Sequence, residues 1–364
     1  MQSASCILEI NLSNIQQNYK LLQSMCPSAE VGAIVKANAY GLGLQKVIPV
    51  LIKIGCRNFF VANVDEGLAA RSVVTSNDNI NVYVLNGIFT NDLALFDTEN
   101  LIPVLNYLEQ ITIWQDFARY KNKILPCIIH INTGINRLGV GSEEIKQIAR
   151  TLMLNSSLDV KYIMSHLSAS EDHNNCYNKF QLDEFNKCLE YLPTTKASLS
   201  NSSGIFLGQE YHFDLVRPGI ALYGGNPTPD KPNLMQQVIR LTAPIIQVQR
   251  IKAGSQVGYN MTFVTERDTI VATLPIGYAD GYPRNLSNLG EVYIDEYKSK
   301  IIGRISMDLI TIDVTDLPPE KIFVGREVEI IGSHCDIEKI AAITGTIPYE
   351  IMTNLSNRYK RIYK

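Results

Sequence analysis

Short apolar runs recur along the first two thirds of the chain. Eight of them occur, at 31–37, 58–64, 81–87, 101–106, 126–132, 160–168, 196–202 and 214–224. Between most of these runs an apolar residue returns every three or four positions, as in an amphipathic helix; examples are 44–55, 64–74, 142–154 and 176–192. Alternating strands and helices predict parallel strand pairing. Eight such units favour a closed (β/α)8 barrel of the TIM type over an open doubly wound sheet, which more often stops at about five or six strands.

A proline-rich polar stretch, NPTPDKPN, follows Gly225 and predicts a domain boundary near residues 226–234, because it suits neither a helix nor a central strand. The segments beyond it are β-branched, often alternating and separated by turns, which predicts a second, mainly β domain. They are 245–251, 268–276, 291–297, 300–314 and 327–332. The opening residues are also strand-like and precede a helical stretch at 13–25. We therefore expect a barrel over 13–231 and a mainly β domain over 232–364 together with 1–12.

Composition and charge narrow the class of partner. With 364 residues, 46% of them hydrophobic, the chain can bury two cores. Its net charge of -3 gives no broad cationic surface for nucleic acid or membranes, so we expect a small-molecule partner. The start of the chain lacks a signal-peptide pattern, and no run reaches the roughly 18 apolar residues of a membrane span, which indicates a cytoplasmic protein. The seven cysteines form no CxxC pair and no zinc-type cluster, so we expect reduced thiols and no metal site.

Functional residues of such a barrel lie at the carboxyl ends of its strands, just after each apolar run. The candidates at these positions are Lys36, Arg137, His166, Asn201, Ser202 and Arg217. Cations and hydroxyl groups dominate this set. It contains none of the HExxH, paired-carboxylate or Ser/His/Asp patterns that hydrolytic chemistry requires.

Lys36 and two small-residue segments together indicate a cofactor. Lys36 ends the apolar run VGAIV, where burial and neighbouring cations favour the neutral amine that a Schiff-base nucleophile needs; taken alone, it could equally be a lysine that reaches solvent from a strand end. The segments SNSSG and RPGIALYG place backbone N–H groups after strands seven and eight, where barrels commonly bind phosphate. Pyridoxal 5'-phosphate needs both an amine for its aldehyde and a nest for its phosphate.

The motifs of this chain resemble those of alanine racemases. VKANAYGLG, NTGINRLGVG, RPGIALYG, VGYNMTF, LPIGYADGYPR, GRISMD and IPYE occur in the order found in that family, across nearly the whole chain. The resemblance implies a barrel followed by a β domain, a pyridoxal-phosphate cofactor, and interconversion of L- and D-alanine. The role that the resemblance implies is the supply of D-alanine for bacterial peptidoglycan.

The resemblance also implies a role for each matching residue in holding the cofactor. Lys36 is expected to bind it covalently, and Arg217 to face the pyridine nitrogen, where it can only donate a hydrogen bond and so keeps that nitrogen unprotonated. The expected phosphate ligands are Tyr40, Ser202, the backbone of Gly219 and Ile220, and Tyr349, with Asn201 beside them.

Racemisation needs a base on each face of the substrate Cα. By resemblance these are Lys36 and Tyr259, the latter reaching from the β domain of a second subunit, and a hydrogen-bond chain through His166 to Arg217 makes the phenol a usable base. Arg137 and the backbone of Met307 are expected to hold the substrate carboxylate. Residues expected to line the access channel are Tyr278, Tyr349, Arg284 and Glu171. Sites shared between chains imply a head-to-tail homodimer.

The chain departs from the family near its NTG motif. Many relatives carry a carbamylated lysine that orients the arginine, but this chain has His130, and Asn132 replaces the usual acidic neighbour. Neither residue carries the negative charge of a carbamate. Arg137 is therefore expected to be held by His130, Asn132, water or a bound anion such as chloride.

Three alternatives remain open from the sequence. A broad-specificity amino-acid racemase would share every cofactor contact. Basic amino-acid decarboxylases also join a barrel to a β domain, but they lack the GYNMTF and GRISMD pair. A non-catalytic pyridoxal-phosphate-binding protein would need no β domain, so residues 232–364 argue against it.

Overall fold

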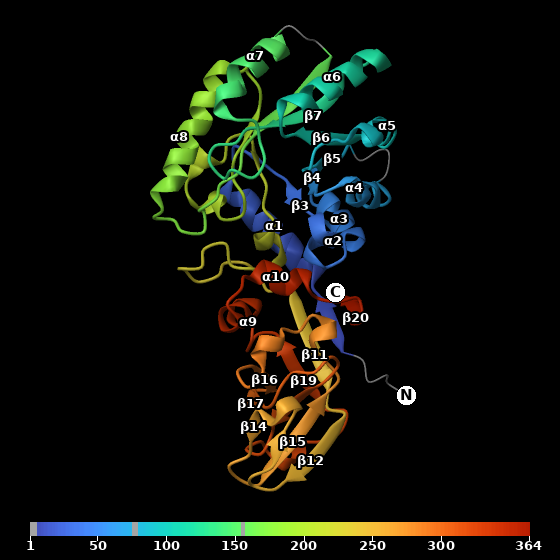
Figure 1. Ribbon diagram of the computed structural model, residues 1–364, viewed down its shortest axis with the longest axis vertical. Coiled ribbons are helices and arrows are strands. Elements are labelled where there is room, and N and C mark those ends of the chain that lie inside the picture. The colour runs from blue at the N-terminus through green and yellow to red at the C-terminus, as the bar shows by residue number, and fades with distance from the viewer. Residues whose placement is uncertain (1–5, 75–78, 154–156) are drawn as a thin grey trace.

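The computed structural model describes residues 6–74, 79–153 and 157–364. It forms two lobes (Figure 1): most of the N-terminal two thirds of the chain forms one, and the C-terminal third, joined by the N-terminal strand, forms the other. Residues 1–5, part of the segment expected to join the β domain, lie outside the described residues, as does Leu154 at the end of one expected helix. No helix in the described ranges combines the length and the apolar character needed to cross a bilayer.

The first lobe is the expected barrel of parallel strands. Seven strands form one sheet in chain order: β3 (Ala33–Ile34), β4 (Asn58–Val61), β5 (Asn81–Val84), β6 (Leu101–Leu105), β7 (Leu125–His130), β8 (Leu158–Met164) and β9 (Ala197–Ser198). The ring closes through β10 (Leu215–Val216), which pairs in parallel with β2 (Glu30–Val31), directly before β3. Backbone hydrogen bonds from Arg217 to Ser200 and from Ile34 to Pro218 join β10 to both neighbours. The barrel prediction is confirmed.

Helices cover the outside of this barrel, as the spacing of apolar residues predicts (Figure 1). Those with eight or more residues in this lobe are α1 (Leu12–Met25), α3 (Leu44–Lys53), α4 (Val64–Arg71), α6 (Leu108–Lys121), α7 (Ile145–Met153) and α8 (Cys176–Tyr191). In α8 the buried positions Asn178, Leu182 and Phe185 recur every three or four residues, so one face packs inward. The Asn175 side chain accepts a hydrogen bond from the Tyr177 N–H and caps the start of this helix.

The second lobe is built on a nine-stranded, mostly antiparallel sheet. The strand order is β12 (Gln247–Ile251), β15 (Thr269–Leu274), β18 (Ile310–Asp313), β17 (Tyr297–Ile301), β16 (Glu291–Ile294), β19 (Glu327–Ile331), β11 (Ile239–Pro244), β1 (Ile7–Ile10) and β20 (Lys360–Tyr363). Strand β1 pairs antiparallel with β11 and parallel with β20, so both ends of the described chain enter this sheet. The mainly β C-terminal domain is confirmed.

Two features of this lobe differ from the sequence expectation. The apolar segment 300–314 is two strands, β17 and β18, separated by a loop that carries the polar residues of GRISMD. Two short helices, α9 (Ile337–Thr344) and α10 (Pro348–Thr353), follow the last predicted strand, and α10 contacts the barrel at α2 (Lys36–Tyr40). Residues 226–234, where the sequence predicts the domain boundary, lie within a stretch, 224–238, that contains neither helix nor strand.

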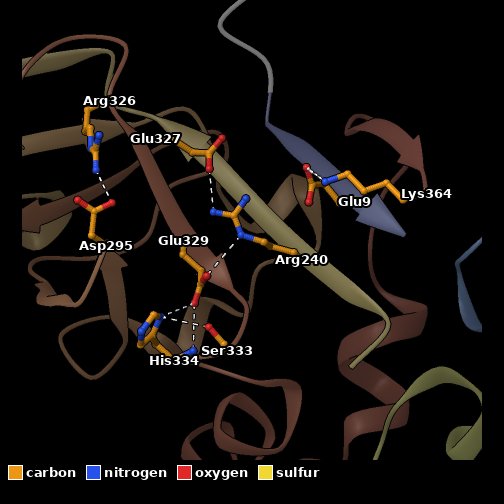
Figure 2. Close-up of polar contacts among 9 residues, drawn as sticks. All are labelled: Glu9, Arg240, Asp295, Arg326, Glu327, Glu329, Ser333, His334 and Lys364. Carbon is orange, nitrogen blue, oxygen red and sulfur yellow. Dashed lines mark hydrogen bonds and ion pairs between the residues drawn. The ribbon is translucent and has the colours of Figure 1, made fainter. Parts of the chain in front are cut away.

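Ion pairs connect neighbouring strands of this sheet (Figure 2). Arg240 on β11 lies 2.7 Å from Glu327 and 3.4 Å from Glu329, both on β19. Lys364 lies 2.8 Å from Glu9 of β1. A surface pair such as Arg240 with Glu327 contributes only about 0–1 kcal/mol, whereas Glu329 is buried. The buried apolar faces of the strands contribute more to holding the sheet together.

Candidate active site

The candidate residues from the strand ends gather at one end of the barrel. Lys36 follows β3, Arg137 lies in the loop after β7, His166 follows β8 and Arg217 follows β10. Burial, and then the positive charge of Arg137, lowers the pKa of the Lys36 amine. Burial, and then the charges of Arg217 and Arg137, holds the pKa of His166 well below its usual value. Residues far apart in sequence therefore form one cationic cluster.

Lys36 is followed by a left-handed turn without a glycine. Residues 37–40 all have φ between 50° and 55°, a region that costs a residue with a Cβ atom roughly 1–2 kcal/mol. Glu66, in the first turn of α4, accepts hydrogen bonds from the N–H groups of Ala37 at 2.7 Å and Ala62 at 2.8 Å. Its carboxylate also raises the pKa of Lys36, although burial and Arg137 outweigh it. Glu66 thus stabilises the turn through its hydrogen bonds and also affects the pKa of the Lys36 amine.

Backbone N–H groups and hydroxyls form a cradle after β9 and β10. Ser202 Oγ accepts hydrogen bonds from the N–H groups of Gly219 at 2.9 Å and Ala221 at 3.3 Å, which leaves its own O–H free to donate elsewhere. A Cβ at position 219 would overlap the Tyr40 hydroxyl, so glycine is required for this close approach. Ile220 begins the short 3₁₀ helix η5 (Ile220–Tyr223). The cradle suits a phosphate group.

Aromatic rings close the cradle from two sides. The Tyr40 ring lies 4.9 Å from that of Tyr223 and 5.8 Å from that of Tyr349, centroid to centroid. Tyr349 belongs to α10, so the second lobe supplies one wall of the cradle in the same chain. Its hydroxyl is beside Glu171, and burial together with this carboxylate raises its pKa. Asn201 acts locally instead: its Oδ1 accepts hydrogen bonds from Ser170 Oγ at 2.8 Å and the Gly204 N–H at 2.9 Å.

Arg217 is buried and held by neutral acceptors. Its guanidinium donates to Ser198 Oγ, to Ser165 O at 2.6 Å and to His166 Nδ1 at 3.5 Å. Burial lowers the pKa of Arg217 to about 9, so it stays protonated at neutral pH. Because arginine only donates, Nδ1 of His166 must be the acceptor, and the neutral ring carries its proton on Nε2. The sequence-predicted pair of His166 and Arg217 is in contact.

Arg137 is exposed and has neither a hydrogen bond nor an ion pair among the described residues. Asn132, one of its expected partners, is engaged within the loop: its Oδ1 accepts hydrogen bonds from the Gly134 and Asn136 N–H groups, both at 3.0 Å. The other expected partner, His130, is buried at the end of β7. Of these two protein partners, His130 is the one with an unused acceptor.

The remaining predicted residues, apart from Glu171, lie in the second lobe and are exposed. Tyr259 is 70% exposed and starts a 3₁₀ turn between β13 (Gln256–Val257) and β14 (Phe263–Val264), away from the barrel in Figure 1. Tyr278 and Met307 are also exposed, and backbone hydrogen bonds join their loops, including one of 3.0 Å from Ala279 N–H to Met307 O. Within one chain these side chains are not brought to Lys36.

A cavity of about 670 Å³ lies next to these loops. Its lining includes Tyr278, Arg284 and Glu350. Two of the residues expected to line an access channel, Tyr278 and Arg284, thus face a common space, whereas Glu171 lies at the barrel beside Tyr349.

Sequence reasoning missed two polar residues of the site, Glu66 and Asn106. Asn106, whose Oδ1 lies 2.8 Å from Nδ1 of His130, directly follows β6 and therefore satisfies the same strand-end rule as Lys36. No residue after this strand was among the candidates predicted from the sequence. Glu66 comes five residues after β4, in the first turn of α4. Carboxylates are common in the first turn of helices, so nothing in the sequence assigned it to the site.

The fold and the cluster define a barrel enzyme with an appended β domain, whose site combines a strand-end amine with an anion-binding cradle. Two family models cover this chain: the alanine racemase N-terminal domain matches residues 10–227, and the alanine racemase C-terminal domain matches residues 238–363. The chain belongs to the alanine racemase family.

Individual relatives agree over the full length. The alanine racemase of Rickettsia canadensis is 55% identical over 358 residues, which cover 98% of this chain and 99% of that protein. The crystal structure of the Bartonella henselae alanine racemase, with covalently bound pyridoxal phosphate, has a TM-score of 0.95 and 43% identity over 99% of this chain and all of that one. The biosynthetic alanine racemase of Pseudomonas aeruginosa has a TM-score of 0.91 and 28% identity, covering 99% of each chain.

Proposed function

We propose that this protein is a cytoplasmic, pyridoxal-phosphate-dependent alanine racemase that supplies D-alanine for peptidoglycan and acts as a head-to-tail homodimer. One observation carries the proposal: the amine of Lys36 and the cradle formed by Ser202 and Gly219 lie at the same end of the barrel. When bound, pyridoxal phosphate supplies an aldehyde that takes up an amino group and a conjugated ring that stabilises negative charge at Cα.

The residues of the barrel fit this cofactor. Lys36 would hold it covalently, since a lowered pKa increases the fraction of neutral, nucleophilic amine. The Ser202 hydroxyl, the Ile220 N–H group and the hydroxyls of Tyr40 and Tyr349 would hold its phosphate. The Gly219 N–H, which donates to Ser202 Oγ in this structure, would turn to the phosphate as well. Arg217 would donate to the ring nitrogen and keep it unprotonated, because its pKa of about 9 is still above neutral pH.

Two bases on opposite faces of Cα would exchange the proton. The Lys36 amine serves one face. The phenol of Tyr259 serves the other, and its 70% exposure leaves it free to enter a second subunit. The proton on His166 Nε2, fixed by the contact of Nδ1 with Arg217, is available to hold the phenolate oxygen of the partner. Arg137 and the Met307 backbone would bind the substrate carboxylate.

The activity is tested with purified protein, L-alanine and D-alanine, and the variants Lys36→Ala and Tyr259→Phe. We expect the lysine change to abolish racemisation in both directions and the tyrosine change chiefly to impair proton abstraction from L-alanine. Normal turnover in either variant would contradict the two-base assignment. A panel of other amino acids distinguishes alanine racemase from a broad-specificity racemase by comparing kcat/KM values.

Mixing the two variants, with racemisation followed from L-alanine, the direction that both changes impair, tests the shared site. A dimer of one Lys36→Ala chain and one Tyr259→Phe chain retains one native site if the two residues come from different chains, and no native site if they come from the same chain. After unfolding and refolding an equimolar mixture, we expect about a quarter of the wild-type activity, because half of the dimers are mixed and each has one native site of two. Activity at the level of the separate variants would refute the shared arrangement.

A further inference from the structure

The amide of Asn106 has a fixed orientation. Asn106 is buried at the carboxyl end of β6, and its Nδ2 donates hydrogen bonds to Leu85 O and Val104 O, both at 3.0 Å. These two carbonyls can only accept, so the NH₂ group must face them. The carbonyl oxygen Oδ1 is thereby directed at His130, where it lies 2.8 Å from Nδ1.

This orientation determines the tautomer of His130. Since Oδ1 of Asn106 only accepts, Nδ1 of His130 must carry a proton. Burial, and then the charges of Arg217 and Arg137, lowers the pKa of this imidazole to about 3, so the ring is neutral. Its Nε2 is consequently a bare acceptor. It is buried and has no hydrogen-bond partner in the described part of the chain, which is an uncommon state for a buried polar atom.

One guanidinium near this acceptor lacks a partner. Arg217 already donates to Ser198, Ser165 and His166. Arg137 has no polar partner among the described residues, and it belongs to a loop that returns to His130, since the Val140 N–H donates to His130 O at 2.8 Å. The loop thus anchors the free cation beside the strand that presents the free acceptor.

We propose that Asn106 holds His130 as the Nδ1–H tautomer, so that Nε2 accepts a hydrogen bond from Arg137 and orients its guanidinium for the substrate carboxylate. The inference rests on the proposed function of Arg137 as the carboxylate ligand. A neutral acceptor fixes the direction of the guanidinium without neutralising it, so the full positive charge stays available to the substrate. Asn106 and His130 are positioning residues in this arrangement.

The tautomer can be measured without any activity assay. The chain has five histidines, so ¹⁵N-histidine labelling of the holoenzyme gives a small set of ring signals, and the set that disappears in His130→Gln belongs to His130. We expect a neutral ring with its proton on Nδ1. In Asn106→Leu that preference is lost, and the signals shift towards the Nε2–H form. A wild-type His130 protonated on Nε2, or an unchanged pattern in Asn106→Leu, overturns the inference.

Kinetics test whether the acceptor acts on substrate binding. His130→Leu removes the acceptor, and we expect KM for alanine to rise roughly ten- to a hundredfold while kcat changes by less than about threefold, because a carboxylate contact is made before and during proton transfer. His130→Gln offers an amide oxygen near the same place and should restore most of the loss. His212→Leu is the matched control: it removes an equally buried histidine, bonded to Ile205 O, and should leave KM unchanged.

A double-mutant cycle shows whether His130 acts through Arg137. In an Arg137→Gln background, His130→Leu should raise KM by no more than about twofold further, since coupled residues are not additive. Equal effects in both backgrounds, or a fall in kcat alone, overturn the inference. Failure of the proposed function itself is distinguishable, because the wild-type protein would then not racemise alanine although the NMR result could still hold.

Discussion

The left-handed turn after Lys36 predicts an unusual response to glycine. Ala37 is exposed, so replacing it removes no packing, but its φ of 50° is unfavourable for a residue with a Cβ atom. Ala37→Gly should relieve roughly 1–2 kcal/mol of strain and lose roughly 0.4–1 kcal/mol through the greater freedom of the unfolded chain. We expect a net stabilisation of about 1 kcal/mol. The same substitution of an exposed alanine in a right-handed helix destabilises the protein.

Ala94 is the matched control for this substitution. It is exposed in the same lobe, within α5 (Leu93–Thr98), a right-handed helix that continues from a 3₁₀ turn. Ala94→Gly should destabilise the protein by about 1 kcal/mol. Urea unfolding followed by circular dichroism measures both changes. All proteins carry the same concentration of pyridoxal phosphate, and the Kd of each is measured separately, because the ligand contribution depends on the ratio of free ligand to Kd. Equal losses of stability in the two variants would refute the strain argument.

Three further predictions follow from the site. Glu66→Gln removes the carboxylate that raises the pKa of Lys36, so covalent uptake of pyridoxal phosphate, followed by absorbance, should extend to lower pH; an upward shift contradicts this. His130 and His166 stay neutral in the folded protein but titrate near 6.5 in the unfolded chain. The free energy of unfolding should therefore fall as the pH drops below about 6.5, and His130→Gln should make that fall less steep. Urea midpoints measured at several pH values test this, and a free energy of unfolding that rises as the pH drops would contradict it. Gly219→Ala places a methyl group against the Tyr40 hydroxyl and should weaken cofactor binding roughly tenfold or more. A fluorescence titration measures the Kd, and an unchanged value would contradict a role for this close approach.

The barrel could be predicted because its signal is local. Each strand is a short apolar run and each covering helix has its own apolar spacing, so chain order alone gives the topology of a parallel barrel. The same rule placed Lys36, His166 and Arg217 at one end, since the carboxyl ends of parallel strands share an edge. Unusual backbone conformations could not be predicted in the same way. The segment KANAY has no glycine, and nothing in it indicates four consecutive residues with positive φ.

The second lobe was harder to predict because its contacts join distant segments. The pairing of β1 with both β11 and β20 brings together residues more than 200 positions apart, and no local pattern encodes such a register. Helix α10 is short, and Pro348 at its start marks only a helix beginning. Its approach to α2, which brings Tyr349 within 5.8 Å of Tyr40, is a property of the folded chain.

The way the cationic cluster is held explains how it can bind anions. Positive charges at Arg137 and Arg217, and at Lys36 when it is protonated, repel one another. No carboxylate forms an ion pair with these residues in the described part of the chain, and Arg217 bonds to carbonyls, a hydroxyl and an imidazole. Glu66 raises the pKa of Lys36, but both its oxygens are engaged by backbone N–H groups. The charge is therefore largely uncompensated: Arg217 is fixed in place, and Arg137 has no polar partner among the described residues. A phosphate and a carboxylate, the two anionic groups of cofactor and substrate, are what such a site attracts most strongly. Carboxylates beside these cations would form ion pairs that stabilise the folded protein. The same carboxylates would compete with the phosphate and the substrate carboxylate, so the site would bind its ligands less well.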